Sequence, residues 1–341
     1  MATGTGLDAQ LGFAAETVVG TPVTVTKFCE FNSEGLAWKP SFVEPAGLRV
    51  GRKYKRASRL VQSRKTVEGG LEMEWPTKGA GTLVAHALGS AGVPVQIAAT
   101  TAYKQIHVPG GLVGKGLTIQ VGRPEPSGTV RAHTYTGCKV VSWEFKLSND
   151  GTLVLALEFD GWDESTATAL ATASFPTGVE VFSFQQAVLK LGGTPSTASG
   201  EMSVSGGTTV STIVTEISIK GDNPLAVERY GIGQTGVKKE QLENDFPTLT
   251  GSLSAEFNRT ELYDLLKNNT TVALELTLTG SLIASGNNYL ISFILPACKI
   301  KEAAPSVEGP DIVQMTTSFE GYDNEVDAPI QIKIVSTDTT L

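Results

Sequence analysis

The residues of this chain that could ligate a metal or act as nucleophiles are few and widely separated. The 341 residues include three cysteines and three histidines, which are Cys29, Cys138, Cys298, His86, His107 and His133. Their spacing contains no CxxC pair and no close pair of histidines, so neither a disulfide framework nor a zinc site is indicated. Cys138 and Cys298 each begin an alternating strand pattern, where a cysteine usually packs as a small hydrophobic residue. His86 lies in an apolar helix candidate and is expected to be a core or interface residue.

Other catalytic patterns are also missing from the sequence. No Ser/His/Asp, Cys/His or paired-carboxylate arrangement stands out, and we therefore predict neither enzymatic activity nor a cofactor. The glycine-rich residues 110–116 superficially resemble a phosphate loop. Their spacing does not match the Walker motif, and no strand-to-helix context surrounds them.

Two long segments that fit neither the helix nor the strand period are the candidate contact sites. Residues 40–65 carry a basic set, Arg49, Arg52, Lys53, Lys55, Arg56, Arg59, Arg64 and Lys65. Residues 223–246 carry Arg229, Lys238 and Lys239. Loops of this length inside a compact domain usually have a function. The first could be an interface arm that meets acidic surface on a neighbouring subunit, a solvated loop or a nucleic-acid-binding arm. We favour the interface, because Tyr54 is the only aromatic residue among its basic residues and the surrounding protein is acidic.

Composition limits the partners of the whole molecule. The formal net charge is -8, so the chain as a whole repels nucleic acid phosphates and anionic membrane surfaces. No apolar run approaches the roughly 20 residues needed to span a bilayer, and the N-terminus lacks the features of a signal peptide. We expect a soluble protein made in the cytoplasm. Its 37 glycines and 16 prolines punctuate short apolar runs, as in proteins with many strands and turns.

The sequence contains an internal repeat. The tripeptide that begins at Cys138 recurs in similar form at Cys298, 160 residues later. The pentapeptide Phe-Asp-Gly-Trp-Asp at Phe159 recurs as Phe-Glu-Gly-Tyr-Asp at Phe319, with the same offset. Together with the upstream matches described next, these collinear matches make chance similarity improbable and predict two copies of one domain.

The repeat continues upstream with a larger offset. Residues 66–75 resemble residues 248–257, and residues 36–39 resemble residues 217–220. The difference between the offsets implies roughly 22 extra residues in the first copy, between its helix and Cys138. Each copy is about 150 residues long and should form a domain with its own core. The expected division is an N-terminal arm at 1–21, domain 1 at 22–168, a linker at 169–180, domain 2 at 181–325 and a C-terminal strand or arm at 326–341.

Alternating apolar residues predict the strands of each copy. Residues 141–147 and 153–159 alternate on either side of an Asn-Asp-Gly turn, which is typical of a β-hairpin with one buried face. Residues 260–267 and 82–88 are short helix candidates. The fold class expected is all-β, with two tandem β-sandwich or barrel domains, each with one short flanking α-helix and a long loop.

One strand is expected to present an acidic face. In residues 66–75 the apolar side chains occupy one face, and Glu68, Glu72 and Glu74 occupy the other. In the second copy this face is formed by Thr248, Thr250, Ser252, Ser254 and Glu256, and it is much less charged.

The N-terminus carries a family resemblance. Gly12-Phe13, Glu16 and Gly20-Thr21-Pro22 follow a pattern similar to the opening of tail tube (major tail) proteins of siphoviruses that infect actinobacteria. The Gly-Gly-Leu-x-x-Glu strand, the helix after it and the Phe-Asp-Gly-Trp-Asp ending also resemble that family, so the resemblance covers most of the chain. A virion-surface or extracellular β-sandwich binding or adhesion module is the alternative. It is disfavoured because the four tryptophans fall at repeat positions that look structural.

The resemblance implies a virion component assembled in the host bacterial cytoplasm. Tube domains in such families join their inner strands around a lumen, and their rings stack into a tube through which DNA passes during ejection. A single-domain subunit forms rings of six, whereas a duplicated subunit resembles those that form trimeric, pseudo-hexameric rings. The implied partners are further copies of the chain, the tape measure protein, and terminator or baseplate proteins, with DNA only transiently in the lumen and no membrane.

Within that expectation the candidate residues acquire roles. Glu68, Glu72, Glu74 and Glu256 would face the lumen and repel DNA phosphates. The basic residues from Arg49 to Lys65 would contact the next ring, because heterologous contacts of this kind propagate into an open filament. Residues 1–20 and 330–335 would be arms that become ordered only on assembly.

Overall fold

Strands dominate the chain, as the composition predicts. A computed structural model describes residues 5–210, 212–257, 260–307 and 309–341. The secondary structure is 49% strand and 7% helix, and one large antiparallel sheet contains 19 of the strands in the described ranges. None of the helices in these ranges is long and apolar enough to cross a membrane. The mostly-β class is therefore confirmed.

The elements follow the chain in two series, each with one α-helix. The first series is η1 (Gly6–Asp8), β1 (Gln10–Ala15), β2 (Lys27–Cys29), β3 (Ser33–Glu34), β4 (Ala37–Val43), η2 (Ala57–Arg59), β5 (Val61–Glu74), α1 (Gly81–Ala87), β6 (Val95–Gln96), β7 (Tyr103–His107), β8 (Leu117–Pro124), β9 (Val130–Ser148), β10 (Val154–Gly161) and β11 (Asp163–Ser165). The second series is η3 (Phe184–Gln186), β12 (Ala187–Leu191), β13 (Thr194–Ala198), β14 (Glu201–Ser205), β15 (Thr208–Thr209), β16 (Val214–Asp222), β17 (Thr248–Glu256), α2 (Glu261–Lys267), β18 (Val272–Ala284), β19 (Asn287–Ser306), β20 (Gln314–Gly321) and β21 (Gln331–Ser336). Both expected helices and the expected hairpin, now β9 and β10, are confirmed.

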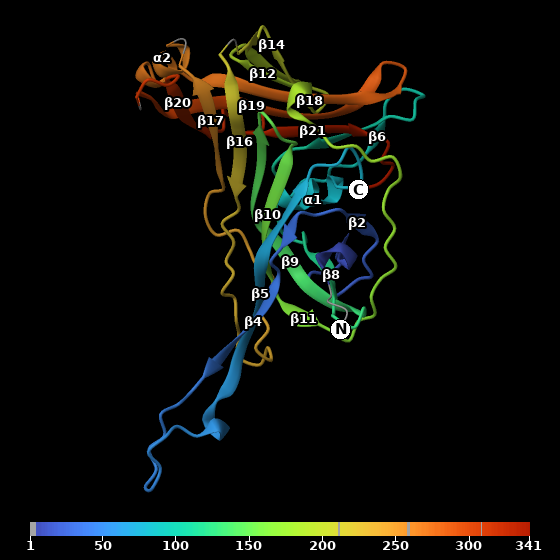
Figure 1. The fold of residues 1–341 in the computed structure, drawn as a ribbon, viewed down its shortest axis with the longest axis vertical. Coiled ribbons are helices and arrows are strands. Elements are labelled where there is room, and N and C mark those ends of the chain that lie inside the picture. The colour runs from blue at the N-terminus through green and yellow to red at the C-terminus, as the bar shows by residue number, and fades with distance from the viewer. Residues whose placement is uncertain (1–4, 211, 258–259, 308) are drawn as a thin grey trace.

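Eight strands form a central layer that runs through both halves. Backbone pairing gives the order β4–β5–β10–β9 in the first half and β16–β17–β20–β19 in the second. The two groups are joined because β9 pairs with β16, with Phe145 opposite Ile219. Figure 1 shows β5, β10, β9, β16 and β17 running roughly along the long axis of the molecule.

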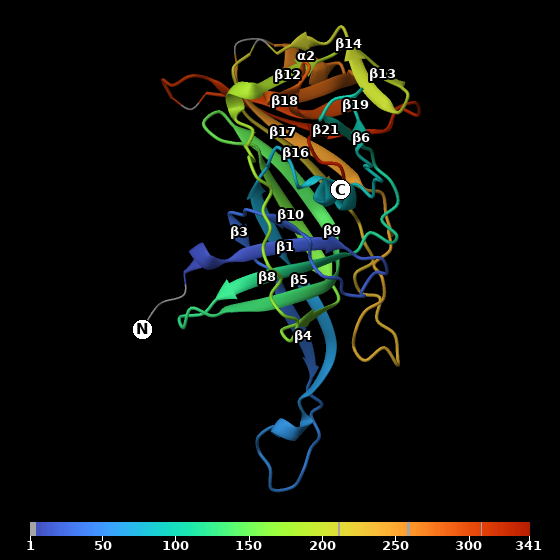
Figure 2. The same cartoon turned by 90° about the vertical axis from the view of Figure 1, so that its right-hand side faces the viewer.

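Strands β9 and β19 are long enough to take part in two layers. The part of β9 before Lys139 pairs with β8 and β11. The first part of β19, up to Cys298, pairs with β18 and β21. Each long strand therefore continues from the central layer into a second set of strands, and Figure 2 shows β1 and β8 crossing the direction of β5 and β10.

The first residues of the repeated pentapeptide, Phe159 and Phe319, occupy matching positions. Phe159 of β10 lies opposite Gly69 of β5, and Phe319 of β20 lies opposite Gly251 of β17. Glycine is required at the second site, because a Cβ on Gly251 would lie 2.1 Å from Cζ of Phe319. The pairing thus follows the offsets read from the sequence.

Strand irregularities recur in the same places. Leu117 pairs with Cys138 in the first half, and Val272 pairs with Cys298 in the second. The register shifts by one residue directly after each of these pairs. The pairing of β9 with β10 shifts at Phe159, and the pairing of β19 with β20 shifts at the equivalent position. Bulges of this kind bend a strand and increase its twist, so both halves bend at equivalent points.

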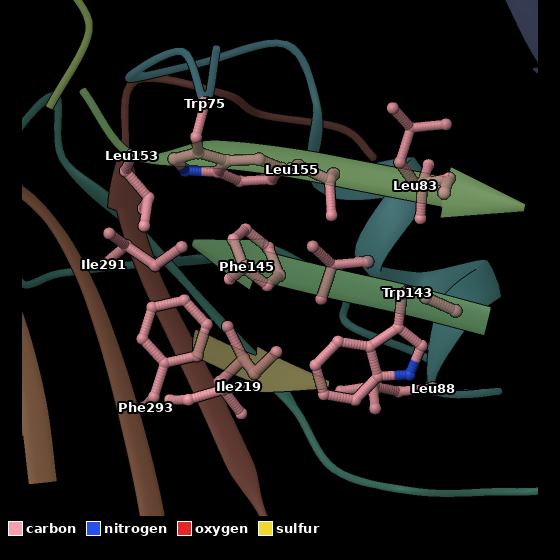
Figure 3. Close-up of a cluster of buried hydrophobic side chains, with 14 of the residues drawn as sticks. Trp75, Leu83, Leu88, Trp143, Phe145, Leu153, Leu155, Ile219, Ile291 and Phe293 are labelled. Atoms are coloured by element: carbon pink, nitrogen blue, oxygen red, sulfur yellow. The ribbon is translucent and has the colours of Figure 1, made fainter. Parts of the chain in front are cut away.

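The hydrophobic core is continuous between the halves. Phe145 of β9 lies with its ring centroid 4.8 Å from that of Phe293 in β19 and 5.4 Å from that of Trp75. Figure 3 shows these rings packed together with Leu153 and Ile291. Two separate cores were expected, but one cluster of buried residues includes both halves. The reason is the β9–β16 pairing, which places the inner faces of the two strand groups in one layer.

The residues between α1 and β8, where the repeat predicts an insertion, connect the first half to the second. They include β6 and β7. β7 pairs with β21, with His107 opposite Ile332, and β21 pairs on its other edge with β19. The insertion therefore adds strand pairing between the halves.

Both chain ends take part in the fold. Leu11 and Phe13 of β1 are buried, and β1 pairs with β2 and β8. β21 lies between β19 and β7. Residues 10–15 and 331–335, which belong to the arms expected to order only on assembly, are thus in strands within a single chain. Their alternating apolar residues bury one face. Residues 1–4 of the expected N-terminal arm lie outside the described residues.

Residues 40–65 form a long hairpin rather than a loop throughout. Residues 40–43 continue β4, residues 61–65 begin β5, and residues 44–60 join them. Figures 1 and 2 show this long hairpin projecting beyond the rest of the molecule at one end of the long axis. The sequence predicted a loop over the whole of residues 40–65, and this was wrong for residues 40–43 and 61–65, which are in strands. These strand residues are largely exposed on both faces, so their sequence does not show the alternation of apolar and polar residues that indicates a strand.

Candidate assembly interface

The junction of β9 with β16 is an antiparallel strand pair between the two halves. Residues 142–148 of β9 pair with residues 216–222 of β16. Lys220 lies directly opposite Glu144, and Nζ of Lys146 lies 3.2 Å from Oε2 of Glu216. Opposite charges on facing strands favour this register.

Two strand edges at the ends of the central layer have no partner. Within the described residues, β4 pairs along one edge only, with β5, and residues 302–306 of β19 pair along one edge only, with β20. In the strand order, β4 has the same place in the first half as β16 has in the second half. The end of β19 has the same place in the second half as the end of β9 has in the first half. Unpaired edges expose backbone donors and acceptors and are templates for pairing with another chain.

The second loop, residues 223–247, packs on the first half through buried polar contacts. Nζ of Lys238 lies 2.6 Å from Oδ1 of Asp160 and donates to Thr66. Gln241 donates to the carboxylate and the carbonyl of Asp160. Burial raises the pKa of Asp160 above its ordinary value, and the ammonium group of Lys238 opposes that rise.

A second buried cation strengthens the same contact. Nζ of Lys139 donates to Glu240 at 2.8 Å and to the carbonyl oxygens of Leu112 and Gln241. Burial lowers the pKa of Lys139, and the hydrogen bond to Glu240 opposes that change. The second loop therefore forms a contact between the two halves. Of its three candidate residues, Lys238 is buried, Lys239 is exposed and Arg229 donates a hydrogen bond to the carbonyl of Glu240.

The tip of the long hairpin, residues 44–60, carries exposed apolar and basic side chains together. Leu48, Val50 and Tyr54 are between 91% and 102% exposed. Among the described residues, no hydrogen bond or ion pair to another side chain involves four of the basic residues, Arg49, Arg52, Lys53 and Arg56. Apolar side chains this exposed on an extended hairpin are typical of a surface that binds a partner.

The other candidate basic residues contact their own chain. Lys55 pairs with Glu44 at 2.6 Å, and Arg59 donates to the carbonyl of Pro45. Two residues belong to β5 rather than to the tip: Arg64 pairs with Glu228 and Lys65 pairs with Asp163. The basic residues that the sequence placed in one loop therefore divide into those of the hairpin tip and those of β5.

The expected acidic face lies on the side of β5 away from the core. Val67, Leu71 and Met73 are buried, and Glu68, Glu72 and Glu74 are exposed, as the alternation predicts. Lys39 of β4 lies 2.9 Å from Glu68. Glu256, the equivalent residue of β17, is half-buried.

The cysteines and His86 are packing residues, as expected. Cys138 and Cys298 are buried, and burial raises the pKa of the Cys298 thiol to about 12. Nδ1 of His86 lies 2.9 Å from the carbonyl oxygen of Thr82, and burial lowers the pKa of His86 to about 4. Neutral thiols of such high pKa are poor nucleophiles.

Sequence reasoning missed the two unpaired edges and the buried charges. Asp160 belongs to the repeated pentapeptide, so a buried role could have been suspected from its apolar neighbours. Nothing in the sequence indicated that Lys238 is buried, because its loop shows no periodic pattern of apolar residues and its partner Asp160 is distant in the sequence.

The chain was compared with known protein families and with curated proteins. A protein-family model described as phage tail tube protein matches residues 6–322. No curated protein matches the chain.

Proposed function

We propose that this chain, which belongs to the phage tail tube protein family and is a structural component of the phage tail rather than an enzyme, contributes two tube domains to each ring. The observation that carries the proposal is the β9–β16 junction. It joins two strand groups of the same order within one chain, and within the described residues the corresponding edges at both ends of the layer have no partner.

Matching strand registers support the two-domain part of the proposal. The pairs at Phe159 and Phe319 and the shifts after Leu117 and Val272 recur at equivalent positions. Independent strand groups would have no reason to share register and irregularities. The proposed boundary lies within residues 169–180, between domain 1 (22–168) and domain 2 (181–325).

The junction within the chain is the proposed template for the contact between chains. Residues 302–306 of β19 in one chain would pair with β4 of the next, as β9 pairs with β16. In that register Lys39 would lie opposite Ala304, and Glu302, two residues from Ala304 on the same face of β19, would lie diagonally within reach of Lys39. Since a ring of this family is expected to hold six domains, three chains would close it.

The acidic face of β5 is proposed to line the lumen. Glu68, Glu72 and Glu74 project from the face of the central layer opposite to the core. Negative charge on that wall would repel DNA phosphates and let DNA slide without binding. Glu256 would occupy the equivalent place in domain 2.

The long hairpin is the proposed contact between rings, because it projects farthest along the long axis and carries the unpaired basic residues. The tape measure protein and the terminator or baseplate proteins are the proposed partners inside the tube and at its ends.

Amide hydrogen exchange tests the proposed strand pairing. We compare assembled tubes with the unassembled chain, and we expect exchange in β4 and residues 302–306 to slow by about tenfold or more in tubes, because edge amides gain hydrogen bonds. The β9–β16 amides are the internal control, since they are paired in both states. Equal exchange of β4 in both states would reject this ring contact.

A further inference from the structure

Helix α2 and the strand ends beside it form a surface that the described residues of the chain leave uncovered. All seven residues of α1 are buried, whereas in α2 only Leu262 is buried. Three large apolar side chains are exposed around α2: Ile213, Tyr263 and Ile312 are 56%, 43% and 61% exposed. The two halves thus differ at their helices, and an uncovered helix face occurs once per chain.

Two of these residues, Ile213 and Ile312, lie beside the end of β17. The amide of Glu256, at the end of β17, donates to the carbonyl of Ile213. The amide of Phe257 donates to the carbonyl of Val313, next to Ile312. Tyr263 follows in α2, which begins shortly after β17.

Among the described residues, the same surface carries several carboxylates. Asp264 of α2 and Asp311 are exposed and lie beside Tyr263 and Ile312 in the sequence, and Glu256 and Glu261 add two further carboxylates. Lys267, at the end of α2, is the single basic residue of that helix. We call Ile213, Tyr263, Asp264, Asp311 and Ile312 the α2 patch.

The α2 patch and the tip of the long hairpin lie at opposite ends of the molecule. In Figure 1, α2 lies at the top of the long axis and the hairpin tip at the bottom, and both lie toward the same side. The view turned by 90° keeps them at opposite ends. Copies stacked along this axis would therefore bring the hairpin of one toward the α2 end of the next.

We propose that the α2 patch binds the hairpin tip of a chain in the adjacent ring. This inference rests on the proposed tube assembly. The tip offers Leu48, Val50 and Tyr54 with surrounding arginines, and the patch offers apolar side chains with surrounding carboxylates. Complementary charge gives such a contact its register, and the apolar residues at its centre provide binding energy. Each chain has one tip and one patch, so the contact is heterologous and propagates without closing.

Charge reversal tests the pairing. The variants are R49E with R52E on the tip, D264K with D311K on the patch, and all four together. We expect each pair of reversals to lower the sedimenting tube fraction about tenfold or more while rings still form, because like charges then face each other. The fourfold variant is expected to regain tubes to within about twofold of the wild type. The control reverses an exposed ion pair elsewhere, E125K with R131E, and leaves tubes unchanged.

Three results would overturn the docking. They are full tubes from either pair of reversals, failure of the fourfold variant to regain tubes, and loss of tubes in the control.

Disulfide cross-linking separates this contact from one within a ring. With R52C and D264C in one chain, oxidised tubes should give a ladder of linked chains that extends beyond one ring; the native cysteines are buried and do not interfere. Linked products that stop at the size of one ring would place the tip in its own ring and reject the proposal. A wild-type ring that does not contain three chains would contradict the proposed number of chains in a ring. The ladder of cross-linked chains would still test whether the hairpin tip binds the α2 patch.

Discussion

Lys238 and Asp160 show how single residues hold the two halves together. Their charged groups are 2.6 Å apart, and both residues are almost fully buried. A buried charge that loses its partner leaves an uncompensated ion in a medium of low dielectric, and this is strongly destabilising. The pair therefore keeps the second loop in place.

Removing the cation should expose this dependence. We expect K238M to lower the free energy of unfolding by about 3–5 kcal/mol, because the carboxylate of Asp160 would remain buried without its cation. Chemical denaturation of the unassembled chain measures the change. K239M is the matched control, because Lys239 is exposed and its loss should cost no more than about 0.5 kcal/mol. Equal stability of the two variants would contradict the assignment.

The sequence pattern predicted which side chains are buried better than it predicted which side chains contact one another. The alternation around Phe159 correctly indicated a buried strand face, and Phe159 and Phe319 each lie opposite a glycine. The pairing of Asp160 with Lys238 could not be predicted, because hydrogen bonds between residues far apart in sequence leave no periodic trace.

At the scale of elements, β5 has the clearest proposed function. Its outer face presents three exposed glutamates, whereas β17 presents hydroxyl groups at most equivalent positions. If both strands line the lumen, the charge on its wall alternates between strong and weak sectors around the ring.

Reversing the charge of β5 tests its role in DNA passage. We expect E68K/E72K/E74K to assemble into tubes, since these side chains lie away from the core, but to impair DNA ejection, because a basic wall attracts phosphates. Ejection from virions carrying the variant and salt-dependent DNA binding to purified tubes are the measurements. The control, E30K/E180K/E325K, reverses three exposed acids elsewhere. Normal ejection by the β5 variant would contradict the lumen assignment.

Elements were predictable where one face is buried. Both helices and the β9–β10 hairpin follow directly from apolar spacing. The long hairpin was not predictable as strand, because its residues 61–64 are exposed on both faces. The free edges of β4 and β19 were also invisible in the sequence, since edge position depends on which strands pair and not on their own pattern.

For the whole molecule, the two strand groups form one layer with a shared core. The repeat predicted two similar units, yet the residues inserted in the first half supply β7, which pairs with β21 of the second. That pairing and the β9–β16 junction hold the halves together more firmly than a linker would. A chain built in this way would enter a ring as one rigid block.

The most direct test of the central claim is the number of chains in one ring. Native mass measurement of isolated rings, combined with end-on images of tubes, counts chains and lobes separately. Two tube domains per chain require three chains and six similar lobes around the lumen. Six chains in a ring, or three lobes from three chains, would contradict the account.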